Sequence, residues 1–178
     1  MFFRLLTLVL TVVYPFIVWW GLSTFGLVFL AGFMVALAAM RYVQDPKSIT
    51  LTLMLVCIML AGASCYYDDP VAIKLYPVLV NGMMLFLFGS SLFDKETIIE
   101  RFARIQNPTL PEEAVRYTRR LTQIWCAFFV MNGGIAFWTA LYASDKVWAL
   151  YNGAIAYGLI GSLFVGEWLY RKYVLKIQ

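Results

Sequence analysis

The chain of 178 residues contains no histidine, only three cysteines, and only 13% charged residues. The absence of histidine removes the side chain that most often serves as general base or zinc ligand. The three cysteines lie in apolar runs without CxxC spacing, so we interpret them as packing residues rather than redox or metal ligands. A glycine-rich nucleotide loop is also missing. The sequence therefore indicates no catalytic residue, cofactor or metal site, and we expect no nucleic-acid partner.

Apolar side chains are abundant and make up 62% of the residues. A soluble globule of this size would need more polar surface than the remainder supplies. Six apolar runs are each near the roughly 17 to 25 residues that a helix needs to cross the hydrocarbon core. These predicted spans are 5–20, 25–40, 49–65, 76–93, 121–142 and 147–170. The sequence therefore predicts an all-α membrane protein with six transmembrane helices, forming one integral membrane domain over 1–178.

The basic residues indicate how the six spans are oriented. Of the fourteen lysines and arginines, all except Lys74 and Lys146 fall on one side of such a bundle. Basic residues accumulate in cytoplasmic loops, so this side is predicted to be the cytoplasm, together with the loop 94–120 and both termini. The first apolar run resembles a signal peptide. A second run follows after a few residues, however, so we expect the pair to be a retained helical hairpin.

The loop 94–120 is the most patterned polar segment of the chain. Four apolar residues recur there at helical spacing, which predicts a short helix lying in the membrane interface between the fourth and fifth spans. They are Ile98, Ile99, Phe102 and Ile105. Pro108 ends this pattern. Thr109 followed by Glu112 matches a capping box, so a new helix is predicted to begin there and to continue into the fifth span.

Five arginines of this loop are candidate ligands for an anionic lipid headgroup or an acidic partner protein, because a guanidinium matches phosphate with two parallel bonds. They are Arg101, Arg104, Arg116, Arg119 and Arg120. The last three share one side of the helix that enters the fifth span. Folding the loop back would then bring all five around one anionic group. The alternative, in which these arginines only anchor the loop on the cytoplasmic side by their charge, stays open.

Three spans share the dipeptide Asn-Gly, at Asn81, Asn132 and Asn152. A turn exposed to lipid would leave backbone groups without partners, so all three dipeptides are predicted to be helical. Their glycines, like Gly158 and Gly161, then indicate close contact between helices, and the asparagines are predicted to hydrogen-bond across those contacts. We expect Asn81 and Asn152 at similar depth in the outer leaflet and Asn132 near the bilayer middle. A polar substrate cavity is the alternative.

Glu167 is the only acidic residue well inside a span, about one turn from the inner end of the last helix. An intramembrane carboxylate is a functional candidate by default. Arg171 follows four residues later, however, and can meet Glu167 on the same helix face. We therefore predict a structural ion pair rather than a proton-transfer site.

Several short motifs carry a resemblance to known families. They are Asn81 preceded by Pro77 and Lys74, the helix start Leu110-Pro111, Trp125 followed by Phe128 and Phe129, and the loop Ser144-Asp145-Lys146-Val147-Trp148. These motifs are remotely similar to the bacterial intracellular septation protein family, over about Lys74 to Tyr170. The resemblance implies an inner-membrane protein associated with envelope synthesis and with division-site or elongation partners.

A second resemblance covers most of the chain and is closer. It is carried by Glu100-Arg101-Phe102-Ala103-Arg104, Ala114-Val115-Arg116-Tyr117-Thr118-Arg119-Arg120 and Gly166-Glu167-Trp168. These segments look like an uncharacterised bacterial inner-membrane protein family whose genes often accompany aryl polyene and fatty-acid-like biosynthesis genes. This resemblance implies an inner-membrane protein without established catalysis.

Two classes of function follow. In the first, which we favour, the chain is a non-enzymatic accessory or scaffold protein that supports cell-envelope lipid or pigment biosynthesis. Its partners are then membrane lipids with anionic headgroups and membrane biosynthetic or cell-envelope proteins. In the second, the chain is a membrane-embedded enzyme or carrier for a lipid-linked anionic substrate. Catalysis needs groups placed to titrate or attack, and the sequence offers such a pair only as carboxylates near the membrane surface.

Overall fold

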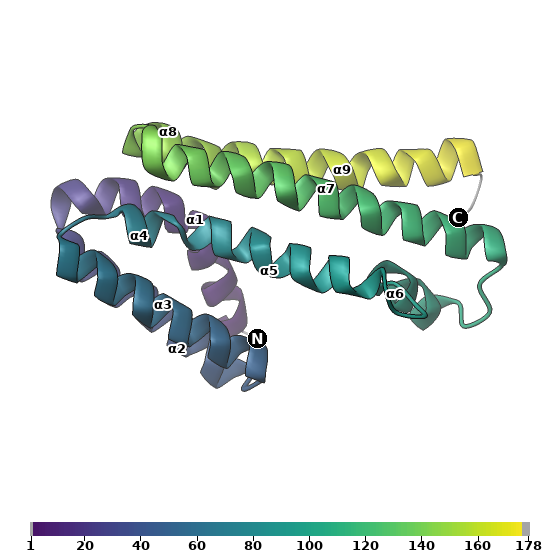
Figure 1. Ribbon diagram of the computed structural model, residues 1–178, viewed down its shortest axis with the longest axis horizontal. Coiled ribbons are helices and arrows are strands. Elements are labelled where there is room, and N and C mark those ends of the chain that lie inside the picture. Colours follow the sequence, from purple (N-terminus) through teal and green to yellow (C-terminus); the bar gives the residue numbers. More distant parts are fainter. Residues whose placement is uncertain (1, 176–178) are drawn as a thin grey trace. The chain divides into compact units, whose positions relative to one another are not determined.

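A computed structural model describes residues 2–175, and within that range the chain forms helices and no strand (Figure 1). Six helical segments are long and apolar enough to cross a membrane, namely Leu5–Thr24, Leu27–Gln44, Ser48–Tyr67, Val71–Ser91, Glu112–Tyr142 and Asp145–Tyr173. Each overlaps one predicted span, so the predicted all-α membrane fold with six spans is confirmed. The side of the membrane on which each terminus lies stays a prediction. The described residues divide into two compact units, unit 1 (residues 2–75 and 139–175) and unit 2 (residues 76–138).

Unit 1 begins with three long helices, α1 (Phe2–Thr24), α2 (Leu27–Gln44) and α3 (Ser48–Tyr67). Gly26 joins α1 to α2 with a φ of 80°, a left-handed conformation that glycine adopts without steric cost. Asp68, with a φ of 51°, ends α3. The carboxylate of Asp69 then accepts a hydrogen bond of 2.8 Å from the backbone N–H of Val71. This contact starts the short helix α4 (Val71–Lys74).

The last span of unit 1 is a continuous run of helical segments. It consists of α8 (Asp145–Leu150), the π-helical turn η1 (Tyr151–Ile155), α9 (Ala156–Tyr170) and the π-helical stretch η2 (Arg171–Leu175). The hydroxyl of Ser144 caps the start of α8 by accepting a hydrogen bond from the backbone N–H of Val147. Within η1, a side chain added at Gly153 would overlap the ring of Phe16 from α1. The glycine therefore permits a close approach of α1 to the last span.

Unit 2 contains α5 (Tyr76–Ser91), α6 (Ile98–Gln106) and residues 112–138 of α7 (Glu112–Tyr142). The buried side chains of α7 recur at intervals of three and four residues, which is the spacing of one helix face. They include Thr118, Thr122, Trp125, Phe129, Asn132 and Ala136, and Phe128 beside Phe129 is buried as well. Phe88 of α5 packs on this face, with its ring centroid 5.2 Å from that of Phe129 and 6.4 Å from that of Trp125. Aromatic rings thus join α5 to α7.

The helix α6 lies where the sequence predicts a short helix, and its placement in the membrane interface stays a prediction. The predicted capping box at the start of α7 is wrong. The helix begins at Glu112, and the Thr109 hydroxyl donates a hydrogen bond of 3.4 Å to the side-chain oxygen of Asn107. The same oxygen accepts the backbone N–H of Thr109 at 3.3 Å. Thr109, which would cap α7 in the predicted capping box, is therefore hydrogen-bonded to Asn107, directly after α6.

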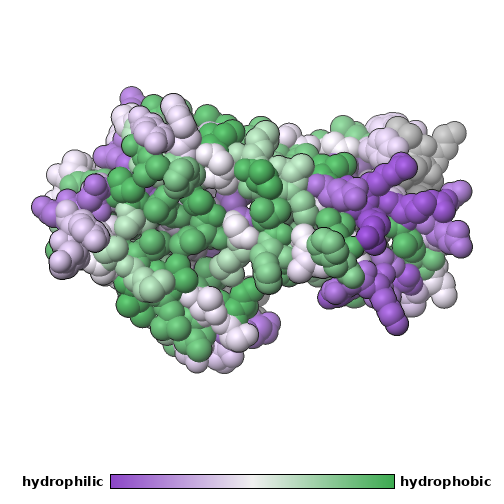
Figure 2. Space-filling view, viewed as in Figure 1, coloured by the Kyte–Doolittle hydropathy of each residue, from purple (hydrophilic) through white to green (hydrophobic). Residues whose placement is uncertain are grey.

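Large apolar side chains cover the outer surface of the spans. Phe86 of α5, for example, is 77% exposed. Water would penalise such exposure, whereas the hydrocarbon of a bilayer covers these side chains at no comparable cost. Figure 2 shows apolar residues over the spanning helices and hydrophilic residues gathered where α6 and the first turns of α7 lie. The polar end of unit 2, formed by α6 and the first turns of α7, is therefore expected to lie outside the hydrocarbon.

Candidate functional site

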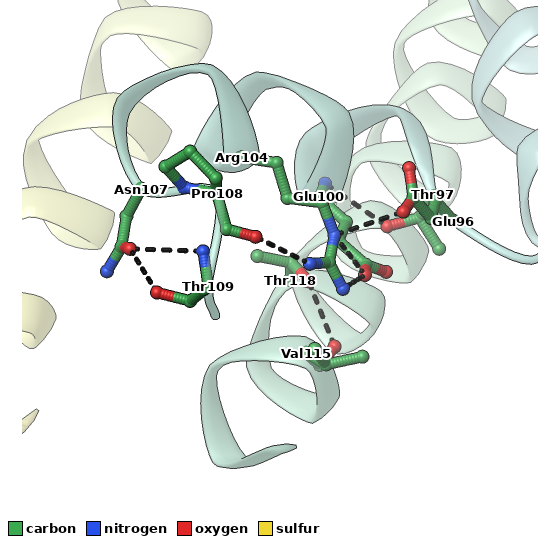
Figure 3. A network of polar contacts seen from close by, with 9 residues as sticks. All are labelled: Glu96, Thr97, Glu100, Arg104, Asn107, Pro108, Thr109, Val115 and Thr118. Carbon is green, nitrogen blue, oxygen red and sulfur yellow. Dashed lines mark hydrogen bonds and ion pairs between the residues drawn. The ribbon is translucent and has the colours of Figure 1, made fainter. Parts of the chain in front are cut away.

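Arg104 of α6 is surrounded by oxygen acceptors (Figure 3). Its Nε and Nη2 donate to Oε1 of Glu100 at 3.0 and 2.6 Å, and its Nε lies 3.2 Å from Oε1 of Glu96. Its Nη1 donates to the carbonyl of Pro108 at 3.1 Å. The side chain of Glu100 is only 3% exposed, so the pairing with Arg104 offsets the cost of burying its carboxylate. Arg104 thus links α6 to the segment that follows it, and an external anion would have to compete with two carboxylates.

Arg101 and Arg116 are each paired with an exposed carboxylate. Nη2 of Arg101 lies 2.7 Å from Oδ2 of Asp94, and Nη1 of Arg116 lies 3.6 Å from Oε2 of Glu112. All four side chains are more than half exposed. Water and salt therefore screen both pairs, and each contributes little to stability.

Arg119 and Arg120 carry charge that no carboxylate compensates within the described residues. Nη2 of Arg119 donates a hydrogen bond of 2.6 Å to the carbonyl of Leu92, directly after α5. This bond satisfies one of the acceptors that a helix leaves open at its C-terminal end. Arg120 is exposed and makes no hydrogen bond or ion pair within residues 2–175. The five predicted arginines therefore do not share one partner, and the uncompensated charge is concentrated at two of them.

Asn81 and Asn132 form a direct contact between α5 and α7. Nδ2 of Asn132 donates to Oδ1 of Asn81 at 3.0 Å, and Nδ2 of Asn81 donates to the carbonyl of Pro77 at 2.8 Å. The predicted hydrogen bond between helices is confirmed for this pair. This bond places the two amides side by side, so the expected difference in depth between them is wrong. The fourth span begins at Val71 rather than at Tyr76, which places Asn81 in the middle of its span.

Asn152 makes its contacts within unit 1. Its Nδ2 donates to Oγ1 of Thr139 at 3.3 Å and to the carbonyl of Trp148 at 2.9 Å. The first bond joins the end of α7 to η1, so this asparagine also links two spans. Asn152 is buried, and its side-chain N–H groups donate to protein oxygens, as the structural interpretation predicts.

The glycines divide into two groups. A Cβ added at Gly133 would lie 3.1 Å from the Cβ of Asn81, and one added at Gly153 would overlap Phe16. The predicted close helix contact is confirmed at these two positions. At Gly82, Gly158 and Gly161 the described residues place nothing within 4 Å of an added Cβ, so close helix contact there stays a prediction.

The predicted ion pair of the last span is present. Nε of Arg171 lies 2.8 Å from Oε1 of Glu167, and the two residues are four positions apart. The carboxylate is therefore neutralised on its own helix face. Whether Glu167 has a further functional role is a separate prediction.

A polar node around α4 was not predicted from the sequence. Nζ of Lys74, whose side chain is 7% exposed, lies 3.1 Å from Oδ1 of Asp145. The indole N–H of Trp148 donates to the Lys74 carbonyl at 3.1 Å. These contacts join α4 to the start of the last span. The sequence did single out Lys74, because it is one of only two basic residues predicted on the outer side.

Ile73 extends the same node to the first helices of unit 1. Its carbonyl accepts a hydrogen bond of 3.2 Å from the hydroxyl of Tyr14 in α1. Its backbone N–H donates to the hydroxyl of Ser64 in α3 at 3.1 Å. The Tyr14 hydroxyl also lies 3.3 Å from the sulfur of Met34 in α2. The four-residue helix α4 is therefore the point at which the helices of unit 1 are bonded together.

Six apolar helical spans with buried polar contacts between them define the class of a multi-pass α-helical membrane protein. The chain is 30% identical over 115 residues to the inner membrane-spanning protein YciB of Thioalkalivibrio sulfidiphilus, which covers 62% of this chain and 49% of that protein. It is 25% identical over 130 residues to the YciB protein of Magnetococcus marinus, covering 71% and 62% of the two chains. For the YciB protein of a Marinomonas species the identity is 28% over 109 residues, with coverage of 61% and 57%.

The matched regions span about half to three fifths of the length of these curated relatives. No family model matches the chain, and no solved structure matches it. The expected similarity to the intracellular septation family is confirmed, at low identity. Together with the six spans, the relatives identify a multi-pass protein of the bacterial inner membrane.

Proposed function

We propose that the protein is a non-enzymatic accessory or scaffold protein that supports cell-envelope lipid or pigment biosynthesis. The observation that carries this proposal is the composition of the polar end of unit 2. There Phe102 and Ile105 of α6 are 62% and 78% exposed. Arg119 and Arg120 add positive charge that no carboxylate of the described residues pairs with. Such a surface suits contact with anionic headgroups and with an acidic partner protein.

The way in which charge is buried favours a scaffold over an enzyme. A catalytic site places titratable groups so that they face a substrate. The buried carboxylate of Glu100 instead faces Arg104, and the buried ammonium of Lys74 faces Asp145. Both charges are held by partners from the same unit, which supports structural roles for them.

The resemblance to the family encoded beside aryl polyene and fatty-acid-like biosynthesis genes supplies the partner class. Its segments include Arg101, Phe102 and Arg104 of α6 and Arg119 and Arg120 of α7. The resemblance therefore coincides with the surface that carries the proposal. We infer that membrane-bound biosynthetic enzymes dock there, next to anionic lipids.

The docking surface is tested by placing a photo-crosslinking phenylalanine analogue at Phe102 in cells of the native host. The matched control is Phe86, which is similarly exposed but lies within the span of α5. We expect adducts with biosynthetic or envelope enzymes at Phe102 and lipid adducts at Phe86. Lipid adducts alone at both positions would reject the docking surface.

The second candidate is an enzyme or carrier for a lipid-linked anionic substrate. It is favoured by the Asn81–Asn132 pair, which places two amides in the middle of a span. Loss of the biological phenotype on substitution of Asn132, without loss of stability, would favour this function over a scaffold.

The scaffold proposal includes the predicted orientation, with loop 94–120 and both termini in the cytoplasm. It is tested with single cysteines at two exposed lysines, Lys146 and Lys95, in a protein that lacks the three native cysteines. An impermeant thiol reagent should label position 146 in intact cells and position 95 only after permeabilisation. The opposite pattern would invert the orientation.

A further inference from the structure

Arg41 differs from the other arginines of the described chain. It lies in α2, three residues before Gln44, where both the helix and the span end. Its Nη2 donates a hydrogen bond of 2.9 Å to the hydroxyl of Thr11 in α1. The guanidinium of α2 therefore reaches α1, about one turn from the end of a span.

No carboxylate of residues 2–175 lies within ion-pair distance of Arg41. The acidic residue four positions further on, Asp45, is paired instead with Lys47 at 2.9 Å. The Nε atom of Arg41 is buried and has no acceptor among the described residues. The side chain thus combines an uncompensated charge with an unmet hydrogen-bond donor, and each is costly in a membrane protein.

The surroundings of Arg41 hold the guanidinium in place. The Thr11 hydroxyl that accepts from Nη2 donates to the carbonyl of Thr7 at 2.7 Å, so its orientation is set by α1. Next to it, Nε2 of Gln44 donates to the Thr7 hydroxyl at 2.7 Å. Nη1 of Arg41 makes no hydrogen bond within the described residues and is not buried. A fixed cation with an accessible end is what an anion site requires.

We propose that Arg41 anchors a binding site for an anionic phospholipid, whose headgroup phosphate takes the place of the missing carboxylate. The depth of Arg41 selects this ligand, because one turn from the end of a span is the level at which a long basic side chain reaches the headgroups. A phosphate offers several acceptor oxygens to one guanidinium. The site belongs to unit 1 and does not depend on the docking surface of unit 2, so either proposal can fail alone.

The test uses the full-length protein in detergent, with lipid retention measured by native mass spectrometry and unfolding followed by heating. The probes are phosphatidylglycerol, phosphatidylcholine and inorganic phosphate. The variants are Arg41→Gln and its control Lys47→Gln, which removes one positive charge from the turn after α2. We expect phosphatidylglycerol to raise the Tm of the unmodified protein and of Lys47→Gln. In Arg41→Gln we expect binding to weaken about tenfold or more.

The outcomes separate the sources of phosphate. Equal retention of phosphatidylglycerol by Arg41→Gln and Lys47→Gln would overturn the site. An equal rise in Tm with inorganic phosphate would overturn a lipid ligand in favour of a free anion. If Arg41→Gln does not fold, Arg41→Lys and Thr11→Val serve in its place, because one keeps the charge without the fork and the other removes the orienting hydroxyl. Undiminished lipid binding by both would also reject the proposal.

Discussion

Unit 1 is joined by a buried ammonium that faces a carboxylate, whereas unit 2 is joined by an amide pair and aromatic rings. In unit 1, Lys74 and Asp145 meet at the node around α4. In unit 2, Asn81 meets Asn132, and Phe88 packs on Phe129. A buried charge that loses its partner is strongly destabilising, while one amide bond between membrane helices contributes little. The contacts that join the helices of unit 1 are therefore more sensitive to a single substitution than the Asn81–Asn132 and aromatic contacts of unit 2, whose buried charge, Glu100, is paired within α6.

The strongest test of this comparison is Asp145→Ala. The variant leaves the Lys74 ammonium buried without its carboxylate, so we expect a loss on the order of 3 kcal/mol in the free energy of unfolding. The measurement is denaturation in detergent. Lys146→Ala, at an exposed neighbouring position, should change stability by less than about 0.5 kcal/mol. Equal stability of the two variants would show that water satisfies Lys74, and the contrast between the units would then disappear.

The next largest effect is expected at the contact between α1 and the last span. Gly153→Ala places a methyl group against the Phe16 ring, whereas Gly158→Ala places one in open space. Both changes raise helix propensity equally, so the difference in unfolding free energy between the two variants measures the steric cost at Phe16. We expect Gly153→Ala to be less stable than Gly158→Ala by about 1 to 3 kcal/mol. If the two unfold at the same temperature in detergent, Phe16 moves aside without cost.

The spans were predictable because hydrophobicity and length are properties of each segment alone. The Lys74 node was not, because it depends on which helices meet. Lys74 and the loop around Asp145 stand far apart in the chain, and only the fold brings them within 3.1 Å. The predicted capping box was wrong for a local reason, because the Thr109 hydroxyl donates to the side chain of Asn107 instead. The expected difference in depth between Asn81 and Asn132 was wrong because the sequence does not show that these two side chains meet.

The pairing of the arginines also could not be predicted from the sequence. Their positive charge is visible in the sequence, yet the carboxylates that face Arg101 and Arg104 lie on the same short segment. The loop 94–120 contains six basic and five acidic residues, so pairing decides which charges are available to a ligand. Side-chain geometry decides that pairing, and spacing alone could not separate Arg104 from Arg120.

A smaller effect is expected for the amide pair of unit 2. Asn132→Leu removes the donor to Asn81 and should lower the free energy of unfolding by about 1 kcal/mol. The double variant Asn81→Leu with Asn132→Leu leaves neither amide without its partner and should recover part of that loss. Unfolding in detergent measures both. Full stability of Asn132→Leu together with a lost phenotype would favour a substrate site over a structural contact.

The smallest effect on stability is expected for two neighbouring arginines, which should differ when each is replaced by alanine. Arg119→Ala removes the bond to the Leu92 carbonyl at the end of α5, so we expect a loss of about 0.5 to 1 kcal/mol. Arg120→Ala removes a side chain that makes no hydrogen bond or ion pair within residues 2–175 and should leave the unfolding free energy unchanged. The same two variants are compared for crosslinking at Phe102. Because Arg120 has no hydrogen bond or ion pair to lose within the described residues, weaker crosslinking in Arg120→Ala at unchanged stability would indicate a lost ligand or partner. Unchanged crosslinking in both variants would assign these arginines to membrane anchoring, and unit 2 would then lose the charge that distinguishes its polar end as a docking surface.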